Sequence, residues 1–109
     1  MKAKYDPEKC RQLIQDSVDI DFFRAICDPV RSELLIFLAS TGELSIGEIA
    51  ENFPQNRSGI SRHLDYMNRF GAVHRRKEGR EVYYRVDKEQ IANKFESASD
   101  NMKALLNQI

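Results

Sequence analysis

Hydrogen-bond donors gather at a helical spacing near the middle of the chain. They stand at positions i, i+1, i+4 and i+5, as Arg57, Ser58, Ser61 and Arg62. In a helix they share one face, because residues three and four apart are neighbours on its surface. Arginine donates in a planar fork that matches base edges and phosphates, and serine adds a small donor. A solvated polar face has a similar composition, so the neighbouring segments decide between the two interpretations.

A basic segment follows these donors. Its cations are Arg75, Arg76, Lys77 and Arg80. Residues 57–85 carry eight Lys and Arg against three acids, whereas residues 1–56 carry six against ten and residues 86–109 three against four. The net charge of zero therefore conceals a positive surplus that is confined to one block. Such a block is the electrostatic footprint of a protein that contacts nucleic-acid phosphates.

Local signals predict the helices that position the donors. Asn56 is a good N-cap, and Gly71 ends the helix that it starts. The buried stripe of that helix recurs at spacings of four, three and three, as Ile60, Leu64, Met67 and Phe70. Before it, Ser45 and Glu48 form a capping box that starts a short helix. The Asp-Pro pairs at 6–7 and 28–29 start two earlier helices, the first with a bend near residue 19.

A change of hydrophobic period after residue 71 predicts a hairpin. Residues 73–77 and 81–86 read as short strands around a turn at 78–80, and a last helix runs from about residue 88 to the end. The fold class is mainly α with a small β-hairpin wing, in the order ααααββα. We expect residues 1–109 to form a single winged helix-turn-helix domain. Such a domain places one helix in the major groove of B-DNA and its wing on the backbone. We predict that Arg57, Ser58, Ser61 and Arg62 lie in the major groove, that Asn56 contacts DNA at the start of the same helix, and that Arg75, Arg76, Lys77 and Arg80 hold the backbone and the adjacent minor groove.

Several segments resemble the ArsR/SmtB family, in family order and spacing. They are FRAICDPVR at 23–31, GELSIGEIA at 42–50, ISRHL at 60–64, GAV at 71–73 and EGREVYYRV at 78–86. The resemblance covers about residues 20–90. It implies a homodimeric bacterial or archaeal repressor that leaves its operator when an inducer binds. It also implies that Arg57, Ser58, Ser61, Arg62 and His63 lie on the recognition helix, where His63 would contact a phosphate or base in the major groove, with Arg80 at the wing tip. For His63, a structural role at the core edge remains open, and a structural or solvent-facing role is expected for His74.

An apolar stripe runs along the last helix at spacings of four, three, four, three and four. Its members are Ile91, Phe95, Ala98, Met102, Leu105 and Ile109. The stripe fits either a dimer contact or packing onto the domain's own core. Together with Leu13 and Ile14 of the first helix, we predict that it forms the dimer surface, as the family resemblance implies. A two-fold dimer predicts an inverted-repeat operator in double-stranded DNA.

The residues that could sense a signal are the two cysteines and the positions where the family binds metals. Cys10 and Cys27 fit three interpretations. They could form a thiol switch, they could form a soft-metal or arsenite site, or they could be packing residues, because free cysteine is usually buried. Where the family's arsenic-type site has cysteines, this chain has Ser45, Gly47 and Ala50, and no histidine follows His74 for a zinc-type site. We therefore expect no cofactor and no recognised metal site, and the inducer is unknown.

Other function classes fit the sequence less well. It has no Gly-rich phosphate loop and no nucleophile–base pairing, so we expect no enzyme. No apolar run approaches the ~20 residues of a membrane span, and two cysteines fit a reducing compartment, so we expect a cytoplasmic protein that joins the nucleoid when bound. The predicted function is a sequence-specific DNA-binding transcriptional regulator, a repressor that an inducer releases. The alternatives are a thiol-based or arsenite-type repressor using Cys10 and Cys27, and a winged-helix protein-interaction module.

Overall fold

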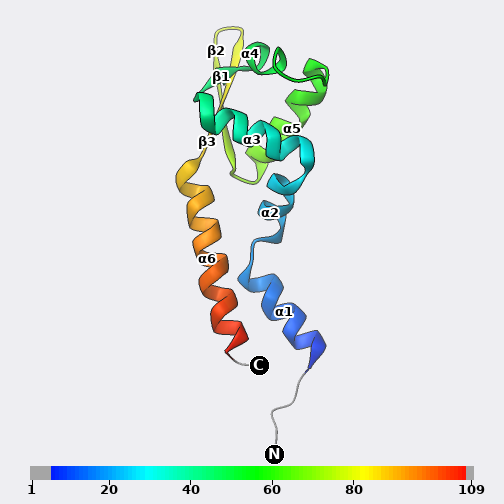
Figure 1. Cartoon of the computed structure of the whole chain (residues 1–109), viewed down its shortest axis with the longest axis vertical. Coiled ribbons are helices and arrows are strands. Elements are labelled where there is room, and N and C mark those ends of the chain that lie inside the picture. Colours follow the sequence, from blue (N-terminus) through cyan, green and yellow to red (C-terminus); the bar gives the residue numbers. More distant parts are fainter. Residues whose placement is uncertain (1–5, 108–109) are drawn as a thin grey trace, which may run out of the picture.

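The computed structural model describes residues 6–107, apart from the side chain of Cys10. Its elements follow the order α1 (Pro7–Ser17), α2 (Ile20–Cys27), α3 (Pro29–Thr41), β1 (Leu44–Ser45), α4 (Ile46–Ala50), α5 (Arg57–Arg69), β2 (Val73–Glu78), β3 (Glu81–Val86) and α6 (Lys88–Leu106). The chain is elongated, with extents of 65 × 23 × 21 Å. A head containing α3, α4, α5 and the sheet stands at one end, and α1 and α6 run away from it as an arm (Figure 1).

Side-chain caps start the helices where the sequence predicts them. Asp28 accepts from the backbone N–H groups of Val30 and Arg31 at the start of α3. The capping box of Ser45 and Glu48 is present in both directions at α4, and Asn56 caps α5. Each cap stabilises its helix by about 1 kcal/mol. The helix-turn-helix pair therefore begins at well-defined residues.

The first predicted helix, with its bend near residue 19, is two separate helices in the structure. The chain is extended at Val18, with φ −125° and ψ 129°, and a second helix begins directly after Asp19. The Asp19 carboxylate accepts from the backbone N–H of Phe22 at 3.1 Å, which makes Asp19 an N-cap rather than an interior helix residue. The first predicted helix is therefore α1 and α2.

The sheet has three antiparallel strands in the order β1-β3-β2, and it includes the predicted hairpin. β2 and β3 pair from Val73 opposite Val86 to Glu78 opposite Glu81, and Gly79 takes a φ of +60° in the turn between them. The two-residue strand β1 adds Leu44 opposite Tyr84 and was not predicted. We refer to β2 and β3 as the wing. The winged helix-turn-helix fold is confirmed, with α4 and α5 as the helix pair.

The core lies beneath α5 and holds it against the rest of the head. Its fully buried side chains include Phe22, Leu34, Leu38, Ile49, Ile60, Leu64, Met67, Val73 and Tyr84. The predicted stripe of α5 is buried at its first three positions, and Phe70 is half-buried. Each such side chain contributes roughly 1.5–3 kcal/mol through apolar burial. The outer face of α5 is thus presented by a helix that is firmly packed on its inner face.

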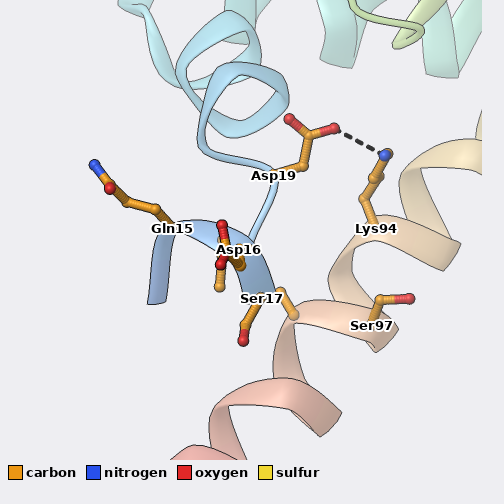
Figure 2. Close-up of a pocket in the computed structure, with 8 residues that line it drawn as sticks. Gln15, Asp16, Ser17, Asp19, Lys94 and Ser97 are labelled. Atoms are coloured by element: carbon orange, nitrogen blue, oxygen red, sulfur yellow. Dashed lines mark hydrogen bonds and ion pairs between the residues drawn. The ribbon is translucent and has the colours of Figure 1, made fainter. Parts of the chain in front are cut away.

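The arm is fastened where α1 meets α2. Lys94 Nζ of α6 donates to the Asp19 carboxylate at 2.8 Å, and Figure 2 shows this pair beside a pocket that Gln15, Asp16, Ser17 and Ser97 also line. Asn101 Nδ2 donates to the backbone oxygen of Ser17 at 2.7 Å. The Lys94 ammonium holds the pKa of Asp19 below its usual range. These contacts tie α6 to both N-terminal helices.

Part of the apolar stripe of α6 packs against other residues of its own chain. Leu105 is only 5% exposed, and Ile91 packs against the core. The ring centres of Phe95 and Phe23 lie 5.0 Å apart, yet the Phe95 side chain is 52% exposed. Ala98 and Met102 are half-buried, and Ile109 lies outside the described residues. None of the helices between residues 6 and 107 combines the length and apolarity that a bilayer crossing requires.

Candidate nucleic-acid interface

The exposed face of α5 carries the predicted donors. Ser58 and Arg62 are exposed on the side opposite the buried stripe, and Arg57 and Ser61 lie on the flank toward the wing. The Asn56 side chain is occupied by its capping role, because Asn56 Oδ1 accepts from the Gly59 N–H at 2.7 Å and from the Ser58 hydroxyl at 2.9 Å. The donors that remain available on this face are chiefly those of the arginines.

A depression of about 400 Å³ joins α5 to the wing. Arg57, Ser58 and Ser61 of α5 and Arg75 of β2 line it, over a base that includes Tyr84. We refer to this depression as the reading groove. The structure therefore brings together donor side chains that are up to 18 positions apart in the sequence, from 57 to 75. The arrangement offers arginine and serine donors from two elements to one anionic or polar partner.

A buried hydroxyl fixes the wing to α5 beneath the reading groove. Tyr84 is 1% exposed, and its hydroxyl donates to Asp65 Oδ1 at 2.6 Å. Burial, reinforced by the Asp65 carboxylate, raises the pKa of Tyr84, so the hydroxyl stays protonated and remains a donor. Arg75 Nε lies 3.7 Å from the same carboxylate. Asp65 and Tyr84 were missed at the sequence level; the one available signal was an acid on an otherwise donor-rich face.

Arg76 does not face the reading groove. Its guanidinium pairs with Glu43 at 2.8 and 3.2 Å, pairs also with Glu78, and lies 4.5 Å from the centre of the Tyr83 ring. These two carboxylates raise the pKa of Arg76 further, and Arg76 in turn lowers the pKa of Glu43. Successive strand residues point to opposite faces, which separates Arg76 from Arg75 and Lys77. The structure thus places Arg76 between the wing and the segment before β1, where two carboxylates hold it, and its phosphate contact stays a prediction.

Two further wing cations are exposed to solvent. Lys77 and Arg80 are exposed, and neither has an ion pair within the part of the chain that the structure describes. Arg80 follows Gly79 in the turn, at the tip of the wing. Both charges are therefore available to an external anion.

The two histidines have different surroundings. His63 is half-buried on α5, with Nδ1 3.3 Å from Arg31 Nη1. His74 Nε2 lies 2.5 Å from the Asp87 carboxylate, which joins the wing to the start of α6. The Gln90 backbone N–H and, next, His74 lower the pKa of Asp87. The structural role expected for His74 is confirmed, whereas a DNA contact for His63 stays a prediction.

Comparison with known proteins identifies the family. The family described as bacterial regulatory protein, arsR family, matches residues 28–75, which span α3 to the first wing strand. The cadmium resistance transcriptional regulatory protein CadC homolog of Staphylococcus aureus is 31% identical over 98 residues, covering 89% of this chain and 77% of that protein. The chain belongs to the ArsR family.

Further relatives agree with this assignment. The transcriptional repressor SdpR of Bacillus subtilis is 32% identical over 65 residues, covering 60% of this chain and 71% of that protein. A homodimeric winged helix-turn-helix DNA-binding domain from Mycobacterium bovis superimposes with a TM-score of 0.63 at 25% identity, covering 95% of this chain and 90% of that one. This ArsR-family chain is accordingly a winged helix-turn-helix DNA-binding transcriptional regulator, and its relatives are regulators rather than enzymes.

The candidate sensing residues are placed only in part. Cys27 ends α2 with its side chain exposed, so the packing interpretation is wrong for Cys27 within one chain. The Cys10 side chain lies outside the described part of the structure. In that described part, no three side chains of His, Cys, Asp or Glu gather closely enough to hold a metal ion. A thiol role for Cys10 and Cys27 stays a prediction.

Proposed function

We propose that this ArsR-family regulator is a homodimeric repressor that binds an inverted-repeat operator and leaves it when an inducer binds. The observation that carries the proposal is the reading groove, where arginine and serine donors of α5 meet Arg75 of the wing. The repressor role follows the Bacillus subtilis relative, which is named a repressor. Acting on chromosomal DNA, the protein would work in the cytoplasm of a bacterium or archaeon.

The donors divide by position into base-reading and backbone-holding groups. Arg62 projects from the outer face of α5, where a helix in the major groove meets base edges, and the neighbouring Ser58 offers its hydroxyl oxygen as an acceptor there. Arg57, Ser61 and Arg75 line the flank toward the wing, where a groove wall offers phosphates. Lys77 and Arg80 extend the contact along the backbone. Specificity would therefore depend on Arg62 most, and overall affinity on the wing.

The dimer would form along the arm. Exposed apolar side chains follow it at Leu13, 38% exposed, and Phe95, 52% exposed, with Ile14, Ala98 and Met102 half-buried nearby. The Mycobacterium bovis neighbour is named homodimeric. We take residues 1–109 as one domain whose terminal helices pair with those of a second copy. The two copies of α5 would then stand about 34–36 Å apart, one turn of DNA.

Sedimentation of a charged arm variant tests the dimer. Phe95→Lys places an ammonium on the proposed interface and should yield a monomer, because an unpaired charge is costly to bury. Ile36→Lys makes the same change at an apolar side chain of α3 that is 61% exposed, outside the arm, and should leave the dimer intact. A monomeric wild-type protein, or equal sedimentation of the two variants, would contradict the proposed interface.

Selection of bound duplexes from a randomised pool tests the DNA-binding proposal. Wild-type protein should enrich an inverted repeat whose half-sites are one helical turn apart. The Arg62→Ala variant should enrich the same repeat with one base pair relaxed in each half-site. Enrichment of a single asymmetric site would overturn the two-fold mode. Failure to enrich any sequence would overturn sequence-specific binding and favour the protein-interaction alternative.

The exposure of Cys27 favours one candidate for the signal, a thiol switch. Reduced and diamide-oxidised protein should then differ in anisotropy-measured affinity for the selected duplex. Cys27→Ser and Cys10→Ser, made separately, would show which thiol responds. Equal affinity of the reduced and oxidised wild-type protein would remove the thiol switch and leave the inducer to be sought among small molecules.

A further inference from the structure

The guanidinium of Arg31 joins α2, α3 and α5 at one point. From the first turn of α3, its Nε donates to the backbone oxygen of Ala25 at 2.6 Å and its Nη2 to that of Arg24 at 3.4 Å. Nη1 lies 3.3 Å from His63 Nδ1, and the guanidinium carbon lies 4.2 Å from the centre of the Tyr66 ring. Arg31 thus contacts two carbonyl groups that end α2 and two side chains of the recognition helix.

The contact with Arg31 decides which nitrogen of His63 carries the proton. A guanidinium has five N–H donors and no acceptor, so the atom that it approaches must accept. His63 Nδ1 is therefore the acceptor, and in the neutral ring the hydrogen is on Nε2. Nε2 is then a donor only. The ring is held by Arg31 at one nitrogen and offers an N–H group at the other.

The place of His63 on α5 indicates what this N–H group meets. At 3.6 residues per turn, positions 61 and 63 are about 200° apart around the helix axis. Ser61 lines the reading groove toward the wing, so His63 is on the opposite flank, beside α3. The flanks of a helix in the major groove face the sugar–phosphate walls, while its outer face meets the bases.

We propose that Arg31 is a positioning residue that fixes His63 as an Nε2–H donor to a backbone phosphate of the operator. The proposal rests on the DNA-binding function proposed above and extends it to residues on the far side of α5 from the wing. Tyr66 stacks against the same guanidinium and limits its movement. Arg31 acts through His63 rather than on the DNA itself, so substituting Arg31 should weaken DNA binding only through the lost His63 contact.

Nitrogen-15 NMR of the histidine rings tests the tautomer without any DNA. The chain has two histidines, so His74→Gln assigns both sets of ring signals. In wild-type protein at alkaline pH, His63 should show a non-protonated Nδ1 and a protonated Nε2. Arg31→Lys keeps the charge but loses the planar fork, and should give a mixture of the two tautomers. A wild-type His63 protonated on Nδ1 would overturn the proposal even if no Arg31 variant folds.

Anisotropy with the selected duplex tests the phosphate contact. His63→Ala should weaken binding about a hundredfold, because the dimer loses two hydrogen bonds to charged groups and each is worth about tenfold. His63→Gln keeps an N–H donor near the Nε2 position and should restore part of this loss, whereas His63→Asn, whose amide reaches only the Nδ1 position, should not. The Arg31→Lys, His63→Ala double variant should bind no worse than His63→Ala alone, because the two residues act in series.

Duplexes with single methylphosphonate substitutions identify the acceptor. One neutralised phosphate in each half-site should weaken wild-type binding but leave His63→Ala binding unchanged. If every methylphosphonate affects both proteins equally and a base substitution does not, His63 reads a base and the phosphate assignment is wrong. Specific wild-type binding with no effect of any His63 variant would overturn this inference alone. Absence of specific binding by the wild-type protein would instead overturn the proposed function.

Discussion

The neighbouring wing cations Arg76 and Lys77 should affect the salt dependence of DNA binding differently. Lys77 is exposed and has no ion pair among the described residues, whereas the Arg76 guanidinium is held by Glu43 and Glu78. Lys77 and Arg75 share the face of β2 that turns toward α5. The change of interest is Lys77→Gln, which removes one charge and keeps a side chain of similar length.

The magnitude follows from counterion release. Each phosphate contact contributes about −0.9 to the slope of log K against log salt concentration, so two wings in a dimer contribute about −1.8. Between 50 and 150 mM KCl, the wild-type advantage over Lys77→Gln should therefore shrink by roughly sevenfold. Fluorescence anisotropy on the selected duplex, across a series of KCl concentrations, measures both slopes.

Two controls separate a local contact from a general loss of charge. Lys103→Gln makes the same change in net charge near the end of α6, away from the wing in a molecule 65 Å long (Figure 1). Screening acts over about 10 Å at 0.1 M salt, so this variant should keep the wild-type slope. The Glu43→Gln, Arg76→Gln double variant removes an ion pair at constant net charge and should keep the slope as well. A wild-type slope for Lys77→Gln, or an equal change for Lys103→Gln, would contradict a local phosphate contact by Lys77.

Three further predictions concern the outer face of α5, the Tyr84–Asp65 hydrogen bond and the Asp19–Lys94 ion pair. Arg62→Ala should cost about 1–3 kcal/mol of specific binding per half-site, measured by anisotropy, and much less on random DNA; equal losses on both would count against base reading. Tyr84→Phe should lower the free energy of unfolding in urea by about 1 kcal/mol, since it removes the bond to Asp65; an unchanged value would show that the bond contributes nothing net. Lys94 lowers the pKa of Asp19, so ionised Asp19 stabilises the fold above its ordinary pKa of 3.8, and this contribution is lost as the pH falls through the folded value. Asp19→Asn, which can still cap α2, should therefore show a weaker loss of stability below pH 4 than the wild type, and identical pH profiles would contradict this.

Features with local causes could be predicted from the sequence. The capping box at Ser45 and Glu48 and the cap at Asn56 each involve residues three positions apart. The buried stripe of α5 repeats within a single helix. Because sequence spacing alone brings these caps and apolar side chains together, the helix-turn-helix pair could be predicted from it. The wing could be predicted from the change of hydrophobic period after residue 71. The missed strand β1 is only two residues long and is defined by its partner β3, so no periodicity could reveal it.

Features with distant causes could not be predicted in this way. The Arg76 guanidinium meets Glu43 from 33 positions away, and the Tyr84 hydroxyl meets Asp65 from 19 positions away. A count of charges treats Arg76 and Lys77 alike, although one is braced by carboxylates and the other is free to meet a phosphate. Arg31 lay within the segment that resembles the family, but its partner His63 is 32 positions away and only the fold brings them together.

The shape of the molecule explains how a chain with zero net charge can bind a polyanion. Six of its seventeen acids lie in residues 6–28, on α1, α2 and their caps, while the positive surplus lies in residues 57–85. α1 and the wing are at opposite ends of a 65 Å molecule (Figure 1). Because screening at 0.1 M salt acts over about 10 Å, the acids of α1 barely weaken the attraction between the wing and DNA. The same acids would oppose DNA that approached along the arm, so the charge pattern favours one docking orientation as well as one docking surface.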